Sequence, residues 1–140
     1  MVPDLITNDA MGRNGKNLSP ELEWWRDPGP LTKSYALTAW DADAPARGGW
    51  WHWVLFDIPP QTHRITEGQS AGTSGTTSFN STGYGGPCPP PGRVHHYRFT
   101  VYALNVAHIG ADFHTTGPEL LAKMDGHVLV KGVTVGLYKR

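Results

Sequence analysis

The glycine and proline content constrains the fold of this chain more than any other feature. Seventeen glycines and twelve prolines make up about a fifth of the 140 residues, which leaves little uninterrupted sequence for long helices. Short runs at 34–40 and 96–104 alternate in polarity, and the run at 52–58 is nearly all apolar. Such runs predict β-strands. We therefore expect a mostly antiparallel β domain.

One helix is predicted late in the chain, over 117–131. Thr116 and Glu119 have the spacing of a capping box, which commonly begins a helix. Gly126 interrupts the helical pattern, and a glycine inside a helix costs about 1 kcal/mol relative to alanine. A terminal strand is expected at 133–139, because valine and tyrosine are frequent there.

Composition and charge describe one globular domain covering 1–140. The 12 Lys and Arg residues balance the 12 Asp and Glu residues, so the chain lacks the basic excess that nucleic-acid binding requires. The single cysteine, Cys88, excludes an intramolecular disulfide. No stretch approaches the roughly 20 apolar residues of a membrane span, and the N-terminus has no signal-peptide pattern. We expect a cytoplasmic protein without stable membrane insertion.

The stretch from 68 to 94 shows little periodicity and is too long for a routine connection. Loops of this length in compact domains are usually functional or disordered. Its second half, GYGGPCPPPG, is expected to be stiff, because proline fixes its own backbone angle and restricts the preceding residue. We expect this loop to lie beside the strands.

Two segments combine residues that bind or transfer protons. The first is DADAPARGGWWHW, at 41–53, and the second is PPPGRVHHY, at 89–97. Each places a histidine at the start of a predicted strand, directly after a loop rich in glycine or proline. If the two strands are neighbours, His52, His95 and Tyr97 converge with Asp41 or Asp43 at one end of the sheet.

These segments resemble the two signatures of the phosphatidylethanolamine-binding protein family. DADAPARGGWWHWVLFDIP is similar to a D-P-D-A-P motif followed by W-H-W-V, and GYGGPCPPPGRVHHYRFTVYAL to a G-P-x-P-P-x-G stretch leading to H-R-Y-x-F-x-V-Y-A-L. GKNLSPELEWW resembles the N-x-S-P-x-L-x-W of the bacterial and archaeal Raf kinase inhibitor-like branch, and VLVKGVTVGLYKR the closing strand. The chain departs from the pattern at Ala42, in place of proline, and at His96, in place of arginine. The N-terminus is also short for the family.

The resemblance implies a fold and a pocket. The fold would be an antiparallel β-sandwich, in which a large central sheet packs on a smaller one, with a C-terminal helix. The pocket would lie at one end of the large sheet and bind phosphoryl groups and similar anions. Carried over position by position, its ligand-binding residues would be Asp41, His52, His95 and Tyr97, with Pro87 and Pro89 as a wall.

The chemistry of these side chains agrees with a phosphoryl ligand. Imidazole and phenol groups donate hydrogen bonds to phosphoryl oxygens. The carboxylate of Asp41 would repel a dianion but would pair with an ammonium, so a zwitterionic head group such as phosphoethanolamine suits the site. A nearby carboxylate raises the pKa of an imidazole, so affinity should fall between about pH 6 and pH 8.5.

Three residues near the pocket have structural expectations. Asp43 is expected to bind turn amides, as an Asp ahead of Ala-Pro commonly does, and Trp53 to pack in the core. The Ala44–Pro45 bond is expected to be cis because it resembles the D-P-D-A-P turn, although only about 5–6% of such bonds are cis in general.

The leading interpretation is a ligand-binding protein with no catalytic residue, cofactor or metal, and with a kinase or protease as a protein partner by family resemblance. Bacterial members of the family are often dimers, so a homodimer is also an expectation. One alternative is a metal-dependent enzyme that uses a His/His/carboxylate site. Another is a β domain that only binds other proteins. A serine hydrolase is disfavoured, because the sequence has no G-x-S-x-G motif.

Overall fold

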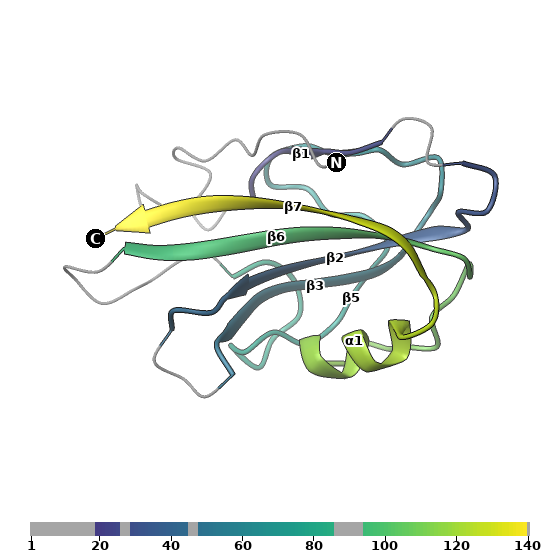
Figure 1. The fold of residues 1–140 in the computed structure, drawn as a ribbon. Coiled ribbons are helices and arrows are strands. Elements are labelled where there is room, and N and C mark those ends of the chain that lie inside the picture. The colour runs from purple at the N-terminus through teal and green to yellow at the C-terminus, as the bar shows by residue number, and fades with distance from the viewer. Residues whose placement is uncertain (1–18, 26–28, 45–47, 86–93, 140) are drawn as a thin grey trace.

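The computed structural model describes residues 19–25, 29–44, 48–85 and 94–139, with 94–95 and 135–139 described by their backbone alone. Two antiparallel sheets and one short helix make up the fold (Figure 1). The elements are β1 (Leu22–Glu23), β2 (Ser34–Asp41), β3 (Trp50–Ile58), β4 (Arg64–Ile65), β5 (Thr73–Ser74), β6 (Val94–Leu104), α1 (Gly117–Met124) and β7 (Val128–Lys139). The larger sheet has the order β5-β3-β2-β6-β7, and β1 pairs with β4 in the smaller one. The predicted mostly β, antiparallel fold is confirmed.

The large sheet separates two apolar layers. Against one face pack Leu22 and Trp24, from the region of β1, and Ile65 of β4. Against the other face pack Leu120 and Met124 of α1. Figure 1 accordingly shows β1 and α1 on opposite sides of the sheet. These two faces are called below the β1 face and the helix face.

The strands follow the polarity patterns in the sequence. The three central strands contain the predicted runs at 34–40, 52–58 and 96–104. On β6 the alternate side chains of Tyr97, Phe99, Val101 and Ala103 all belong to the apolar layer on the β1 face. A period of two residues is what a strand with one face buried in this way requires.

The predicted helix is too long and the predicted last strand too short. Helix α1 begins at the expected capping box, in which Thr116 and Glu119 each accept the other's backbone N–H. It ends at Met124, because Asp125 adopts extended angles (φ −56°, ψ 127°) and Gly126 a left-handed conformation (φ 84°). The chain then continues as β7 from Val128, so 128–131 belong to a strand.

The loop after β5 covers the outer edge of β3. Backbone N–H groups of Gly75, Ser78 and Gly85 donate to the carbonyls of Val54, Trp51 and His52, at 2.8, 2.9 and 2.8 Å. The expectation that this loop lies beside the strands is correct as far as Gly85. The remainder of the proline-rich half, 86–93, lies outside the described residues.

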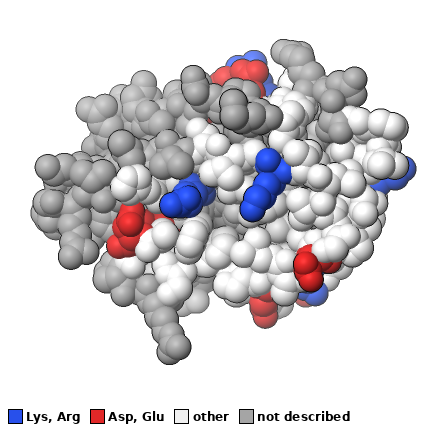
Figure 2. Space-filling view, viewed as in Figure 1, with Lys and Arg blue, Asp and Glu red and all other residues white. Residues whose placement is uncertain are grey.

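The surface carries charged side chains in separate small groups. Figure 2 shows mostly uncharged surface in this view, with acidic and basic side chains touching in places and no continuous basic patch among the described residues. No helix within the described ranges is long and apolar enough to span a membrane.

Candidate functional site

The site predicted from the sequence begins where β2 ends. Asp41, the last residue of β2, is paired with Tyr97 of β6 on one side and with Trp50 of β3 on the other. Asp41 and Tyr97 are only 3% and 2% exposed. The register therefore brings a buried carboxylate and a buried phenol together at one end of the β1 face.

A bulge in β3 adds His52 to this group. Ala39 pairs with Trp53 and Trp40 with Trp51, so His52 is an extra residue without a partner on β2. An extra residue interrupts the alternation of side chains, and bulges commonly re-aim a side chain beside a functional site. Trp53, the neighbour of His52, belongs to the layer on the β1 face. Because of the bulge His52 lies on the same face, where its ring contacts the phenol ring of Tyr97 with 5.0 Å between centroids.

His52 is held in place by its surroundings. Its ring is 4% exposed and meets the rings of Tyr97 and Phe79 edge to face, at 5.0 and 5.5 Å. Its Nδ1 lies 2.6 Å from the carbonyl oxygen of Gly85. A carbonyl can only accept a hydrogen bond, so Nδ1 carries a proton. In the neutral ring Nε2 is therefore an acceptor, and it donates only when the imidazole is protonated.

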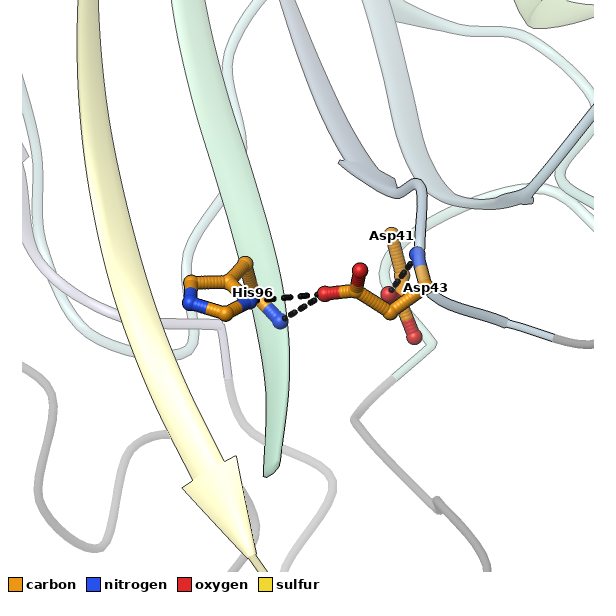
Figure 3. A network of polar contacts seen from close by, with 3 residues as sticks. All are labelled: Asp41, Asp43 and His96. Carbon is orange, nitrogen blue, oxygen red and sulfur yellow. Dashed lines mark hydrogen bonds and ion pairs between the residues drawn. The ribbon is translucent and has the colours of Figure 1, made fainter. Parts of the chain in front are cut away.

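Both aspartates bind backbone amides near the end of β2 (Figure 3). The Oδ1 of Asp41 accepts the backbone N–H of Asp43 at 2.9 Å. The carboxylate of Asp43 accepts the backbone N–H and the ring Nδ1–H of His96, at 2.9 and 2.7 Å; the turn at 45–47, whose amides Asp43 was expected to bind, lies outside the described residues. The pairing of β2 with β6 ends at Asp41 and Tyr97. The next residue on β6 is His96, and its backbone N–H therefore donates to the side chain of Asp43.

Several predicted site residues have an incomplete structural description. The backbone of His95 lies on β6 opposite Tyr138, two residues from Tyr97, and its side chain lies outside the described residues. Pro87 and Pro89 also lie outside them, as does Pro45 and with it the expected cis bond. For these positions the sequence-based expectations stand as predictions.

Trp53 is core, as expected. It is 1% exposed and meets the ring of Tyr84 edge to face at 5.4 Å. Its indole N–H is buried and has no hydrogen-bond partner within the described part of the chain. Burial also raises the pKa of Tyr84 far above the usual range of a phenol.

Sequence reasoning missed two aromatic residues at the mouth of the site. Phe79 is 42% exposed and contacts both His52 and Trp50, with centroid distances of 5.5 and 5.4 Å. Trp50 lies within the segment at 41–53, but nothing in the sequence marks it as part of this group. The only available signal was the length of the loop that contains Phe79, since no periodicity indicates where that loop runs.

The described part of the chain contains no group of three or more His, Cys, Asp or Glu side chains arranged to hold a metal ion. Among the predicted site residues, Asp41 and His52 are the described side chains of a type that binds metals. What the described arrangement offers directly is a buried set of hydrogen-bonding groups with an aromatic rim.

These features define a mostly β protein with buried polar and aromatic side chains gathered at one end of its large sheet. The family model of phosphatidylethanolamine-binding proteins matches residues 3–139, and the chain belongs to this family. It is 35% identical over 138 residues to the UPF0098 protein YbhB of Escherichia coli, covering 93% of this chain and 87% of YbhB. It is 38% identical to a UPF0098 protein of Methanothermobacter thermautotrophicus, covering 91% of this chain and 86% of the relative.

The solved structures agree with the sequence comparisons. The crystal structure of E. coli YbcL, described as a new member of the mammalian PEBP family, superimposes with a TM-score of 0.86 at 28% identity and covers 98% of both chains. The predicted family and its bacterial and archaeal branch are confirmed. Membership supports a ligand-binding protein.

Proposed function

We propose that this protein binds a small phosphoryl-bearing molecule at the end of the β1 face, through Asp41, His52 and Tyr97. The observation that supports this most is the bulge in β3, which brings His52 against Tyr97. All three side chains are less than 5% exposed. Hydrogen bonds and charge interactions are stronger in such an environment than in water.

The protonation of His52 determines what it recognises. Because Nδ1 donates to Gly85, the other ring nitrogen, Nε2, is the atom that meets a ligand. As an imidazolium, His52 donates from Nε2 to a phosphoryl oxygen, and a hydrogen bond between two charged groups is roughly twice as strong as a neutral one. The phenol of Tyr97 is a second donor of the right kind.

Asp41 selects for a zwitterion. One of its oxygens accepts the N–H of Asp43, which fixes the carboxylate at the end of β2. A dianion would be repelled by this charge, whereas the ammonium of a phosphoethanolamine-type head group would be attracted. His95, by its place on β6, supplies a further donor in this proposal, and Pro87 and Pro89 form a wall.

Binding without a chemical step, cofactor or metal is part of the proposal, and so is a cytoplasmic location. Contact with a kinase or protease and formation of a homodimer extend it, and family resemblance alone supports these two. The binding of a head group is the part that the described side chains support directly.

Calorimetric titration with glycerophosphoethanolamine, a zwitterionic phosphodiester, tests the proposal. His52→Ala and His95→Ala should each weaken binding about tenfold to a hundredfold, because a hydrogen bond to a charged group contributes about 1.5–3 kcal/mol. Tyr97→Phe keeps the ring and its packing and removes only the hydroxyl, so its loss of affinity is independent of folding. His114→Ala, at an exposed histidine, is the matched control and should bind as the wild type does. Equal affinity for the His52, Tyr97 and His114 variants would overturn the proposal.

A further inference from the structure

A hollow lies on the helix face of the sheet, on the opposite side from the proposed head-group site. It has a volume of about 320 Å³ and lies between the start of β3, the loop at 76–80 and the first residues of α1. Trp51 forms part of its lining and pairs with Trp40 across the two strands. The two indoles stack at 5.7 Å, on the opposite face of the sheet from Asp41.

The wall formed by Trp51 is fixed by close packing. Gly117, the first residue of α1, approaches the indole so closely that an added Cβ would overlap its six-membered ring. The backbone of Trp51 also makes two hydrogen bonds with Ser78. The Trp51 N–H donates to Ser78 Oγ at 2.8 Å, and the Ser78 N–H donates to the Trp51 carbonyl at 2.9 Å. An apolar surface of fixed orientation therefore lines one side of the hollow.

The rim next to Trp51 is a tight turn with polar groups available for binding. Thr77 N–H donates to the carbonyl of Ser81 at 2.9 Å, and Asn80 N–H donates to the carbonyl of Thr77 at 3.0 Å. Asn80 has φ 60°, a left-handed conformation that asparagine tolerates. Its carboxamide has no hydrogen-bond partner among the described residues. The hydroxyl of Ser78 accepts from Trp51 and so has its own proton to donate.

The lining determines the charge of a ligand. Among the residues that the structure describes, every one that lines the hollow is uncharged, including glycines, Trp51, threonines, Ser78 and Asn80. The positive end of the α1 dipole would attract an anion. The carboxylate of Glu119 already occupies this position, because it accepts the N–H of Thr116 at 2.9 Å. This bond lowers the pKa of Glu119, so a negative charge is held at the helix start. An anion would be repelled there. The carboxylate of Glu119 is already bonded to Thr116 and is not part of the lining, so the described lining residues offer a cation no carboxylate to pair with.

We propose that this hollow binds a neutral sugar ring, with the apolar face of a pyranose toward Trp51 and its hydroxyls bonded to Asn80 and Ser78. The volume is at the lower end of the range for small-molecule sites, about 300–1,000 Å³, which suits one monosaccharide unit. A wholly apolar ligand would leave the amide and hydroxyl groups unpaired, which is costly. A polyhydroxylated ring with one apolar face satisfies both kinds of surface.

Nuclear magnetic resonance with ¹⁵N-labelled protein tests this assignment. Methyl glucoside, methyl galactoside, methyl mannoside and N-acetylglucosamine are added up to tens of millimolar, with glucosamine and glucuronate as charged comparators. At least one neutral sugar should give saturable shifts at the Trp51 indole N–H and at the amides of Ser78, Asn80 and Gly117. Glucosamine and glucuronate should shift these signals less.

Two variants of the same turn make the test specific. Asn80→Gly removes the carboxamide, and glycine adopts φ 60° without strain, so the affinity should fall about threefold to tenfold, the worth of one neutral hydrogen bond. Ser81→Ala removes a neighbouring exposed hydroxyl outside the lining and should bind as the wild type does. His52→Ala should also leave sugar binding unchanged, which separates this site from the head-group site. Absence of saturable shifts with every neutral sugar, or equal affinity in the Asn80 and Ser81 variants, would overturn the proposal.

Discussion

Replacing Trp53 by alanine should lower the free energy of unfolding by about 3–5 kcal/mol, the usual cost of truncating a buried aromatic residue. Trp53 is 1% exposed and packs on Tyr84, so the cavity left behind could not close easily. Trp53→Phe should cost much less. Phenylalanine keeps most of the ring contact and removes an indole N–H that has no partner among the described residues. Relief of an unpaired buried donor is worth about 1–3 kcal/mol and offsets part of the lost packing.

Urea unfolding followed by far-ultraviolet circular dichroism measures both variants without relying on tryptophan fluorescence. Trp25→Ala is the matched control, because Trp25 is half-buried and stacks on Tyr35 at 6.4 Å, and it should cost clearly less than Trp53→Ala. Two results would refute the reasoning. A loss below about 1 kcal/mol for Trp53→Ala would show that the residue is not core, and equal losses for alanine and phenylalanine would show that the indole N–H makes a stabilising bond.

Three further predictions concern charged and titrating groups. Asp43→Ala should lower stability by no more than about 1 kcal/mol in urea unfolding, because the pair with His96 is half-exposed; a loss above 2 kcal/mol would mean that the turn depends on it. Glu119→Gln should be less stable than the wild type at neutral pH and equally stable in acid. The bonds to Thr116 lower the pKa of Glu119 in the folded protein. The stabilisation by the Glu119 carboxylate is therefore present above the pKa of the unfolded state and is lost as the pH falls through the pKa of the folded state. A stability difference between the variant and the wild type that does not depend on pH would contradict this. Tyr84, whose pKa is raised by burial, should not ionise at pH 11, and the phenolate absorbance of Tyr84→Phe should then match that of the wild type. The raised pKa keeps the phenol of Tyr84 neutral in the folded protein. The contribution of Tyr84 to the free energy of unfolding is therefore complete below the pKa of the unfolded state and is lost as the pH rises above that value.

The sequence predicts the strands well, because each central strand buries a regular pattern. The predicted helix is too long because Leu120, Met124 and either His127 or Val128 recur at helical spacing, whereas Val128, Leu129 and Val130 fit a strand equally well. The decisive feature was the backbone at Asp125 and Gly126, which turns the chain out of the helix. In the structure the three residues are about 40% exposed on β7, so their hydrophobicity gave no guide to a buried face.

Sequence patterns mark Asp41, His52 and Tyr97 as candidate site residues, but they do not reveal the geometry that brings these side chains together. Strict alternation from Trp53 would turn His52 to the helix face, and only the extra residue in β3 brings it to Tyr97. A bulge depends on the pairing of two strands, which a single strand's pattern does not reveal. The bonds from Asp43 to His96 have the same origin, since they depend on where β2 stops pairing with β6.

The pH dependence of head-group affinity tests the central claim most directly. A phosphodiester has no second ionisation near neutrality, so in calorimetric titrations with glycerophosphoethanolamine from about pH 6 to 8.5, at fixed ionic strength, a change in affinity reports on the protein. Since Nδ1 of His52 donates to Gly85, only the protonated ring can donate to the ligand through Nε2, and imidazoles ordinarily titrate near pH 6.5. The affinity of the wild type should fall as the pH rises, and His52→Ala should flatten the curve. Affinity that is constant or increases with pH in the wild type would contradict binding through the His52 imidazolium.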